Sequence, residues 1–292
     1  MAQTLLVTGA SGFLGWNLCQ LAAPHWQVYG TYQTRSPAIP HTTLVPVDLT
    51  DRAALSDLFQ QVKPDAVVHL AAQSSANRCE TDPETAYQIN VLATWAIADL
   101  CADRAIPLAF TSTDLVFDGS HAPYTETAPV SPLSRYGEHK VLAETGILAR
   151  YPQAAICRMP LLFGATHPAA RSFLQDFAQI LRSGQELRLF TDEFRTPVSG
   201  TTAANGLLLA LAKAQGILHL GGPERISRYE FGRLMVEALD LPAATLTACR
   251  QRDVPMAATR PADVALDSTK AFALGYAPRS LQAELQALRG LV

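Results

Sequence analysis

Apolar and polar positions along the first half of the chain switch repeatedly between two spacings. Short apolar runs rich in β-branched residues predict buried strands, and segments with apolar residues three or four positions apart predict helices between them. The expected strands are Thr4–Thr8, Gln27–Tyr32, Thr43–Val47, Ala66–Leu70, Pro107–Thr111 and Ala154–Arg158. The expected helices are Phe13–Ala22, Asp51–Val62, Pro83–Cys101 and one that begins near Tyr136. This alternation indicates a parallel sheet with helices on both faces.

Beyond Arg158 the pattern weakens, because prolines and glycines divide it into shorter pieces. Ser227 and Glu230 have the spacing of a capping box, which predicts that a helix begins there. We therefore expect an α/β protein: a Rossmann-type doubly wound parallel sheet with a smaller C-terminal substrate-binding lobe. The Rossmann domain is expected over residues 1–158, with about 199–220 returning to it, and the lobe mainly over 159–198 and 221–292.

Composition narrows the range of partners. The 292 residues are 48% hydrophobic and 17% charged, as in a compact folded protein. A formal net charge of −3 gives no general attraction to nucleic acid or to anionic lipid, so neither partner is expected. The five cysteines form no C-x-x-C pair, and no leader pattern or long apolar stretch is visible, so a cytoplasmic location is expected. The seven histidines lack metal-type spacing, and no catalytic metal is expected.

A glycine-rich turn joins the first expected strand to the first expected helix. Glycine permits the tight turn and the close backbone approach that a pyrophosphate needs, and the N–H groups at the helix start can donate to it. A turn of this kind can also occur without a ligand, but its place between strand and helix favours dinucleotide binding. The expected contacts are Gly9, Ser11, Gly12, Phe13, Leu14 and Gly15.

The end of the second strand indicates which dinucleotide binds. An Asp or Glu there would accept a hydrogen bond from the ribose 2′-hydroxyl and would repel a 2′-phosphate. The stretch from Gly30 to Arg35 holds no carboxylate, and Arg35 could bind a 2′-phosphate. The sequence therefore predicts NADP(H), with NAD(H) as the second option. The alternative is that Arg35 is an ordinary loop cation.

Two further strand ends could contact the cofactor. Asp48 and Leu49 follow the third strand, where the acid could accept a hydrogen bond from the adenine amino group or could cap the next helix. Ala71 and Ala72 follow the fourth strand, where small residues let a cofactor approach the backbone, although alanine is also common in any core.

Tyr136 and Lys140 are four positions apart, which places a phenol and an ammonium on the same side of a helix. A cation beside a tyrosine lowers its pKa, and a lowered pKa suits acid–base catalysis. This spacing also arises by chance on surface helices. The context favours function, because Thr113 and Asp114 close the fifth strand at the sheet edge where ligands bind. A hydroxyl there could hold a substrate carbonyl, and Ser112 is the rival to Thr113.

Together these motifs resemble the extended short-chain dehydrogenases/reductases. The segments that more narrowly resemble the dTDP-4-dehydrorhamnose reductase family are 112–119, 131–133, 219–223, 260–261 and 266–267. The resemblance spans nearly the whole chain. It implies NADPH-dependent reduction of the C4 carbonyl of a nucleotide-linked keto-sugar, and a homodimer. It also implies that Tyr136 is the general acid and Lys140 its ribose-bound partner, that Thr113 orients the carbonyl and that Asn90 supports a proton-relay water.

Several positions depart from that family's pattern. Leu115 stands where the family carries a tyrosine and Leu161 where it usually carries a tryptophan, while Ala76-Asn77 replaces a Val-Asp pair. These departures favour a nucleotide sugar other than dTDP-4-dehydrorhamnose. Asn90 could instead be a polar residue on a helix surface, and Thr113 could simply end its strand.

Other binding roles and other functions stay open. Asp114 is expected at the substrate, and Arg195 and Arg260 could clamp its diphosphate or act as structural ion-pair partners. The chain also resembles the regulatory β subunit of methionine adenosyltransferase, which binds NADP without being an enzyme. Epimerisation of a nucleotide sugar is a third option. Dehydration is disfavoured, because dehydratases carry a second carboxylate where Leu115 stands.

Overall fold

The computed structural model describes residues 2–34, 36–165 and 172–292. Within these residues the main sheet has seven strands in the order β11-β6-β5-β4-β1-β2-β3, and every neighbouring pair is parallel. The chain therefore reverses its direction of progress between β1 and β4, which is where open α/β sheets bind ligands. The strands are β1 (Thr4–Thr8), β2 (Gln27–Tyr32), β3 (Thr42–Pro46), β4 (Ala66–His69), β5 (Leu108–Thr113), β6 (Ala155–Met159) and β11 (Gly216–His219).

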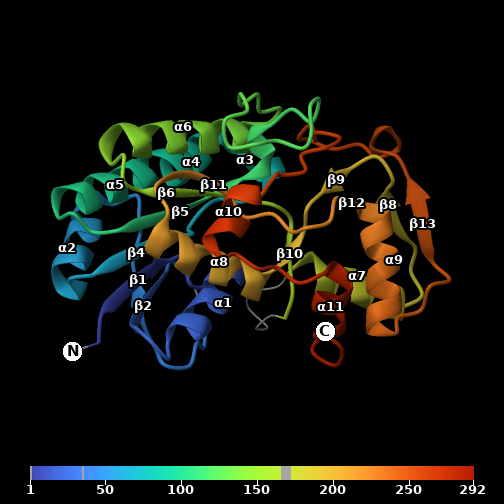
Figure 1. Ribbon diagram of the computed structural model, residues 1–292, viewed down its shortest axis with the longest axis horizontal. Coiled ribbons are helices and arrows are strands. Elements are labelled where there is room, and N and C mark those ends of the chain that lie inside the picture. The colour runs from blue at the N-terminus through green and yellow to red at the C-terminus, as the bar shows by residue number, and fades with distance from the viewer. Residues whose placement is uncertain (1, 35, 166–171) are drawn as a thin grey trace.

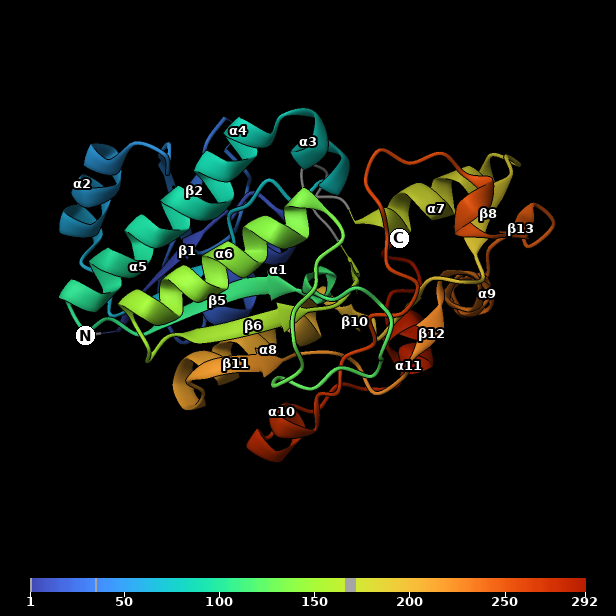
Figure 2. The same cartoon turned by 90° about the horizontal axis from the view of Figure 1, so that it is seen from above.

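Helices cover both faces of this sheet (Figures 1 and 2). Alternate side chains of β1 enter two separate cores, with Leu5 and Val7 in one and Leu6 in the other. The first core contains α1 (Phe13–Ala22) and α8 (Gly200–Lys213). The second contains α2 (Arg52–Val62), α5 (Ala93–Asp103) and α6 (Arg135–Arg150). The expected Rossmann-type α/β fold is confirmed.

The region from 76 to 103 differs from the single helix expected over Pro83–Cys101. It contains α3 (Ala76–Thr81), α4 (Pro83–Tyr87), a π-helical turn at Gln88–Leu92 and then α5. The π turn contains Asn90, whose side chain points inward and is 1% exposed. A helix-surface position for Asn90 is therefore wrong, and a π turn of this kind often marks a functional site.

The second half of the chain builds a smaller body beside the carboxyl edge of the sheet (Figure 2). Ser227 and Glu230 form the expected capping box at the start of α9. The helices here are α7 (Phe173–Arg182), α9 (Arg228–Leu239) and α11 (Leu281–Gln286), with a 3-10 turn at Gln251–Asp253. The helix α10 (Thr269–Leu274) packs instead on the first core of the main sheet, and another 3-10 turn at Asp114–Val116 directly follows β5. Two-stranded sheets pair β10 (Val198–Ser199) with β7 (Leu162–Phe163), β12 (Ile226–Ser227) with β9 (Phe194–Arg195), and β13 (Leu246–Cys249) with β8 (Leu187–Phe190). None of the helices in the described ranges is long and apolar enough to span a membrane.

Candidate functional site

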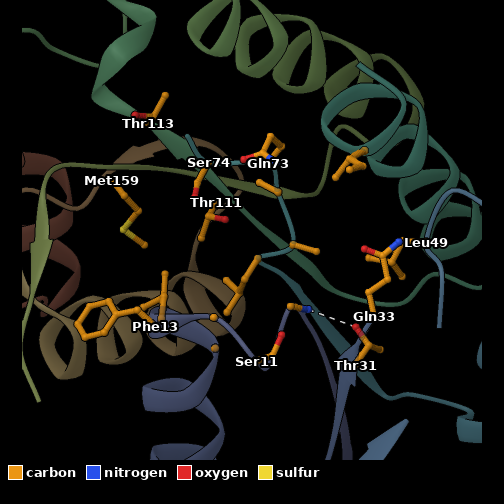
Figure 3. Close-up of a pocket in the computed structure, with 18 of the residues that line it drawn as sticks. Ser11, Phe13, Thr31, Gln33, Leu49, Gln73, Ser74, Thr111, Thr113 and Met159 are labelled. Carbon is orange, nitrogen blue, oxygen red and sulfur yellow. Dashed lines mark hydrogen bonds between the residues drawn. The ribbon is translucent and has the colours of Figure 1, made fainter. Parts of the chain in front are cut away.

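A cavity of about 500 Å³ lies at the carboxyl edge of the sheet, at the reversal between β1 and β4. Figure 3 shows its side chains, with Gln33 and Leu49 toward one end and Met159 and Thr113 toward the other. The predicted residues that line it are Gly9, Ser11, Gly12, Phe13, Leu14, Gly15, Asp48, Leu49, Ala71, Ala72, Thr113, Tyr136 and Lys140. Residues far apart in sequence therefore meet around one space, while their individual roles stay predictions.

The glycine turn forms the floor of this cavity. Gly9 has a left-handed φ of 72°, and a Cβ atom there would lie 2.8 Å from the backbone of Ala71. A Cβ at Gly15 would collide with the backbone of the turn, including the Cα of Ala10 at 2.7 Å. These positions require glycine for the turn itself. Gly12, the N-cap of α1, has no capping side chain among the described residues, so the first-turn N–H groups face the cavity without a side-chain acceptor.

The end of the cavity near Gln33 and Leu49 contains one carboxylate, that of Asp48. Asp48 accepts hydrogen bonds from the N–H and the hydroxyl of Thr50 at 2.9 and 2.7 Å, and these bonds lower its pKa. The cap of α2 is Asp51 instead, so a helix cap at Asp48 is wrong. Gln33 lines this end directly after β2. Arg35 lies outside the described residues.

The other end of the cavity brings Thr113, Tyr136 and Lys140 together. Tyr136 lies in the first turn of α6 and Thr113 at the end of β5, and both line this end of the cavity. Lys140, one turn further along α6, donates from Nζ to the carbonyl oxygen of Thr111 at 2.8 Å. Its Nζ lies 5.9 Å from the centre of the Tyr136 ring. Ser112 also lines the cavity, and its buried hydroxyl has no hydrogen-bond partner among the described residues.

Burial dominates the electrostatics of these groups. It raises the pKa of Tyr136 above its usual value, Cys79 and Asp114 raise it further, and only the nearby hydroxyl of Thr113 opposes them. The expectation that Lys140 lowers the pKa of Tyr136 is therefore wrong for this structure. Burial lowers the pKa of Lys140 to about 8, although Glu144 opposes the shift. At neutral pH Lys140 is mainly a cation and Tyr136 keeps its proton.

A buried chain of hydrogen bonds runs behind the site, and no sequence motif predicts it. Thr8 Oγ1 accepts from the N–H groups of Leu70 and Ala71, so its proton points to His69 Nδ1 at 2.6 Å. Thr94 donates to the carbonyl of Asn90 at 2.8 Å, so its oxygen accepts from His69 Nε2 at 2.9 Å. His69 therefore carries its proton on Nε2, and burial lowers its pKa to about 3, which keeps it neutral beside Lys140.

Asn90 does not line the cavity but holds one of its walls. Its side-chain oxygen accepts from the N–H of Gln73 at 2.8 Å, and its amide donates to the Gln73 carbonyl at 3.1 Å. Gln73 and the following Ser74 line the cavity. The structure thus places Asn90 as a support of this wall, and a role beside a proton-relay water stays a prediction.

The three remaining predicted substrate contacts belong to a charge cluster in which Asp114 and Arg195 are buried and Arg260 is partly exposed. Asp114 is 2% exposed, and its Oδ1 lies 2.7 Å from Nη1 of Arg195. Glu193 lies 3.5 Å from Arg195 and 3.9 Å from Arg260. Arg195 is thus an ion-pair partner in this structure, which is one of the two roles left open. The Arg260 side chain is 36% exposed and keeps donors for another ligand. Contact of either arginine with a diphosphate stays a prediction.

Other cavity residues escaped the sequence analysis because no motif marks them. Most stand directly after a strand or beside a predicted position, so their signal is the carboxyl edge of the sheet itself. They are Thr31, Tyr32, Gln33, Val47, Thr50, Leu70, Gln73, Ser74, Ile89, Thr111, Met159, Pro160 and Leu162. Among the described residues, no group of three or more His, Cys, Asp or Glu side chains could hold a metal ion.

Comparison with known proteins places this architecture in a family. A family model described as the RmlD substrate binding domain matches residues 3–289. The chain belongs to this family. Among solved structures, a hypothetical dTDP-4-dehydrorhamnose reductase from Sulfolobus tokodaii superposes with a TM-score of 0.84 at 30% identity, over 96% of this chain and 98% of that one. The resemblance seen in the motifs is thereby confirmed.

Curated relatives of this RmlD-family chain include both a reductase and a regulatory subunit. The protein named "Probable low-salt glycan biosynthesis reductase Agl14" from Haloferax volcanii is 31% identical, over 97% of this chain and 96% of its own length. The methionine adenosyltransferase 2 subunit beta of Xenopus laevis is 32% identical, over 94% of this chain and 83% of its own length. The two classes of relative correspond to two of the functions that the motifs left open.

Proposed function

We propose that this RmlD-family protein is an NADP(H)-dependent reductase of a nucleotide-linked 4-keto-sugar. The observation that carries the proposal is the meeting of Thr113, Tyr136 and Lys140 at one end of a cavity whose floor is the glycine turn. The same cavity thus offers places for a dinucleotide and for a reducible carbonyl. Membership of the family and a relative named as a reductase support this assignment.

The residues present fit a nicotinamide dinucleotide. Gly9 and Gly15 close the turn, and the uncapped first turn of α1 offers N–H donors to a pyrophosphate. Lys140 uses one donor on the Thr111 carbonyl, so two remain for ribose hydroxyls. When bound, the reduced nicotinamide supplies the hydride. The absence of a carboxylate from Thr31 to Thr34, together with Arg35 in the sequence, supports NADP(H) over NAD(H).

The protein side chains supply the proton and orient the carbonyl. Tyr136 keeps its proton at neutral pH because burial raises its pKa, so it can donate to the oxygen that gains charge during reduction. Lys140 stays a cation at neutral pH, and we propose that it holds the ribose beside Tyr136. Thr113 donates a second hydrogen bond to the same oxygen. The leucines at 115 and 161 remove the aromatic rings expected around a rhamnose precursor, and they favour a different sugar.

A second candidate function follows from the similarity to methionine adenosyltransferase 2 subunit beta. In that case the cavity would hold NADP(H) while the protein regulates a partner subunit. A thermal-shift panel of NADP(H), NAD(H) and dTDP-, UDP- and GDP-sugars tests both candidates, because a specific ligand stabilises the fold by mass action. A reductase is stabilised by NADP(H) and by one nucleotide-sugar class. A regulatory subunit responds to NADP(H) alone and co-elutes with the catalytic subunit in gel filtration. No shift with any pyridine nucleotide contradicts both.

A further inference from the structure

We propose that Arg195 is a positioning residue that acts through Asp114 on the hydroxyl of Thr113, so that this hydroxyl can donate to the substrate. The inference rests on the proposed function and assigns new roles to two residues expected to touch the substrate. It starts from the unusual place of Asp114, which directly follows Thr113 yet does not line the cavity.

The hydroxyl of Thr113 has one proton and more than one acceptor for it. Its Oγ1 already accepts the N–H of Leu115 at 3.2 Å, which fixes the side chain at the start of a 3-10 turn. Asp114 Oδ1 lies 3.3 Å away and can accept the Thr113 proton. A substrate carbonyl in the cavity would need that same proton. Asp114 and the substrate are therefore competitors.

Arg195 binds the Asp114 oxygen that competes with the substrate for the Thr113 proton. Its Nη1 donates to the same Oδ1 of Asp114 at 2.7 Å, shorter than the 3.3 Å contact with Thr113. A charge-assisted hydrogen bond is roughly twice as strong as a neutral one, and it withdraws negative charge from the oxygen that accepts it. Arg195 therefore weakens the hold of Asp114 on the Thr113 proton.

Burial of Asp114 strengthens its competition with the substrate for the Thr113 proton. Asp114 is 2% exposed, and its Oδ2 has no hydrogen-bond partner among the described residues, so Oδ1 carries its polar contacts there. Water cannot replace a lost partner at such a site without cost. Without Arg195, the carboxylate would turn to the nearest donor, which is the hydroxyl of Thr113.

Contacts within the smaller C-terminal body hold Arg195 in place. Arg195 belongs to β9, which pairs with β12, and Glu193 holds its second nitrogen at 3.5 Å. Glu193 also lies near Arg228 and Arg260, each at 3.9 Å. The orientation of a hydroxyl at the end of β5 thus depends on a residue from the body that faces the sheet edge.

The test is a double-mutant cycle on steady-state reduction by NADPH, with a matched control at the residue directly before β12. Arg195→Met should lower kcat roughly 10- to 100-fold with the Kd of NADPH unchanged, because one hydrogen bond to the reacting oxygen is lost. Adding Asp114→Asn should restore most of that kcat, since a neutral amide competes weakly for the Thr113 proton. Arg195→Lys should be intermediate, and it replaces Arg195→Met in the cycle if that variant does not fold.

Arg225→Met is the control. Arg225 forms a 2.7 Å ion pair with Asp263, and its own side chain is half-exposed, so this variant should leave kcat unchanged. A rise in KM with kcat unchanged in Arg195→Met would show direct substrate binding and would overturn the inference. A double variant no more active than the single variant would also overturn it. Wild-type protein that is inactive with every nucleotide-linked keto-sugar overturns the proposed function, and this inference with it.

Discussion

Lys140 Nζ and the carbonyl oxygen of Thr111 lie 2.8 Å apart, which fastens the helix that carries Tyr136 to the strand that ends in Thr113. Nothing else in the cavity lining carries a positive charge, as far as the described residues show. Holding a cation there has a cost, because burial lowers the pKa of Lys140 from 10.5 to about 8. We therefore expect Lys140 to lower the free energy of unfolding of the protein while it serves the cofactor site.

The stability cost of burying this cation can be measured with the variant Lys140→Met. Below pH 8 the wild type keeps a charged lysine buried, so the variant should be more stable by about 2 kcal/mol after the lost hydrogen bond is deducted. The folded-state pKa lies below the unfolded value, so wild-type stability rises as the pH increases from about 8 to 10.5. Above that window the sign of the difference should reverse, because only the hydrogen bond to Thr111 then distinguishes the wild type from the variant. Urea unfolding at several pH values measures it.

Lys213→Met is the matched control for that series, because Lys213 also donates to a carbonyl but is exposed. Its stability difference should stay near zero at every pH. A Lys140→Met variant that is less stable than the wild type at pH 6 would contradict the account of this residue.

Two glycines of the turn, Gly15 and Gly12, should respond differently to alanine. Gly15→Ala forces a Cβ into the backbone of the turn and should lower the free energy of unfolding by roughly 2 kcal/mol or more. Gly12→Ala meets only Gly9 O at 3.4 Å, an ordinary contact, so the fold should keep its stability. Gly12→Ala should still weaken NADPH binding at least about tenfold, because the methyl group stands where the backbone approaches a phosphate. Equal NADPH affinity in Gly12→Ala and wild type would refute the assigned site.

Cofactor choice should depend on position 33. Gln33→Asp places a carboxylate at the end of β2, where it accepts from a ribose 2′-hydroxyl and repels a 2′-phosphate. The ratio of NADPH to NADH affinity should fall by roughly tenfold or more. Gln27→Asp, at the other end of β2 and outside the cavity lining, should leave the ratio unchanged. Calorimetric titration of both cofactors decides the matter, and an unchanged ratio in Gln33→Asp would remove the basis for NADP(H) preference.

The features that could be predicted from the sequence are those set by near neighbours. Strands such as Thr4–Thr8 and Gln27–Tyr32 match the structure to the residue, because β-branched, apolar and aromatic residues are concentrated in both. The glycine turn and the four-residue spacing of Tyr136 and Lys140 are equally local. They could therefore be recognised, and the structure brings them to one cavity.

The features that escaped prediction depend on contacts between distant parts of the chain. Asp114 and Arg195 are 81 positions apart, and nothing in either segment indicates that they pair. The π turn at Gln88–Leu92 interrupts a region with no glycine or proline to mark a break, and the inward side chain of Asn90 holds Gln73 there. The raised pKa of Tyr136 reflects burial, which the spacing to Lys140 could not show.

We propose that Tyr136 gives a proton to a keto-sugar while NADPH is oxidised. The most direct measurement is NADPH consumption with dTDP-, UDP- and GDP-linked 4-keto-sugars, comparing wild type, Tyr136→Phe and Tyr29→Phe. Tyr29 is the control, because its hydroxyl contacts Gln27 and does not line the cavity. We expect turnover with one nucleotide class, a kcat lowered roughly 10²- to 10⁴-fold in Tyr136→Phe, and no change in Tyr29→Phe. Turnover that survives intact in Tyr136→Phe, or no turnover by the wild type with any of these sugars, would contradict it.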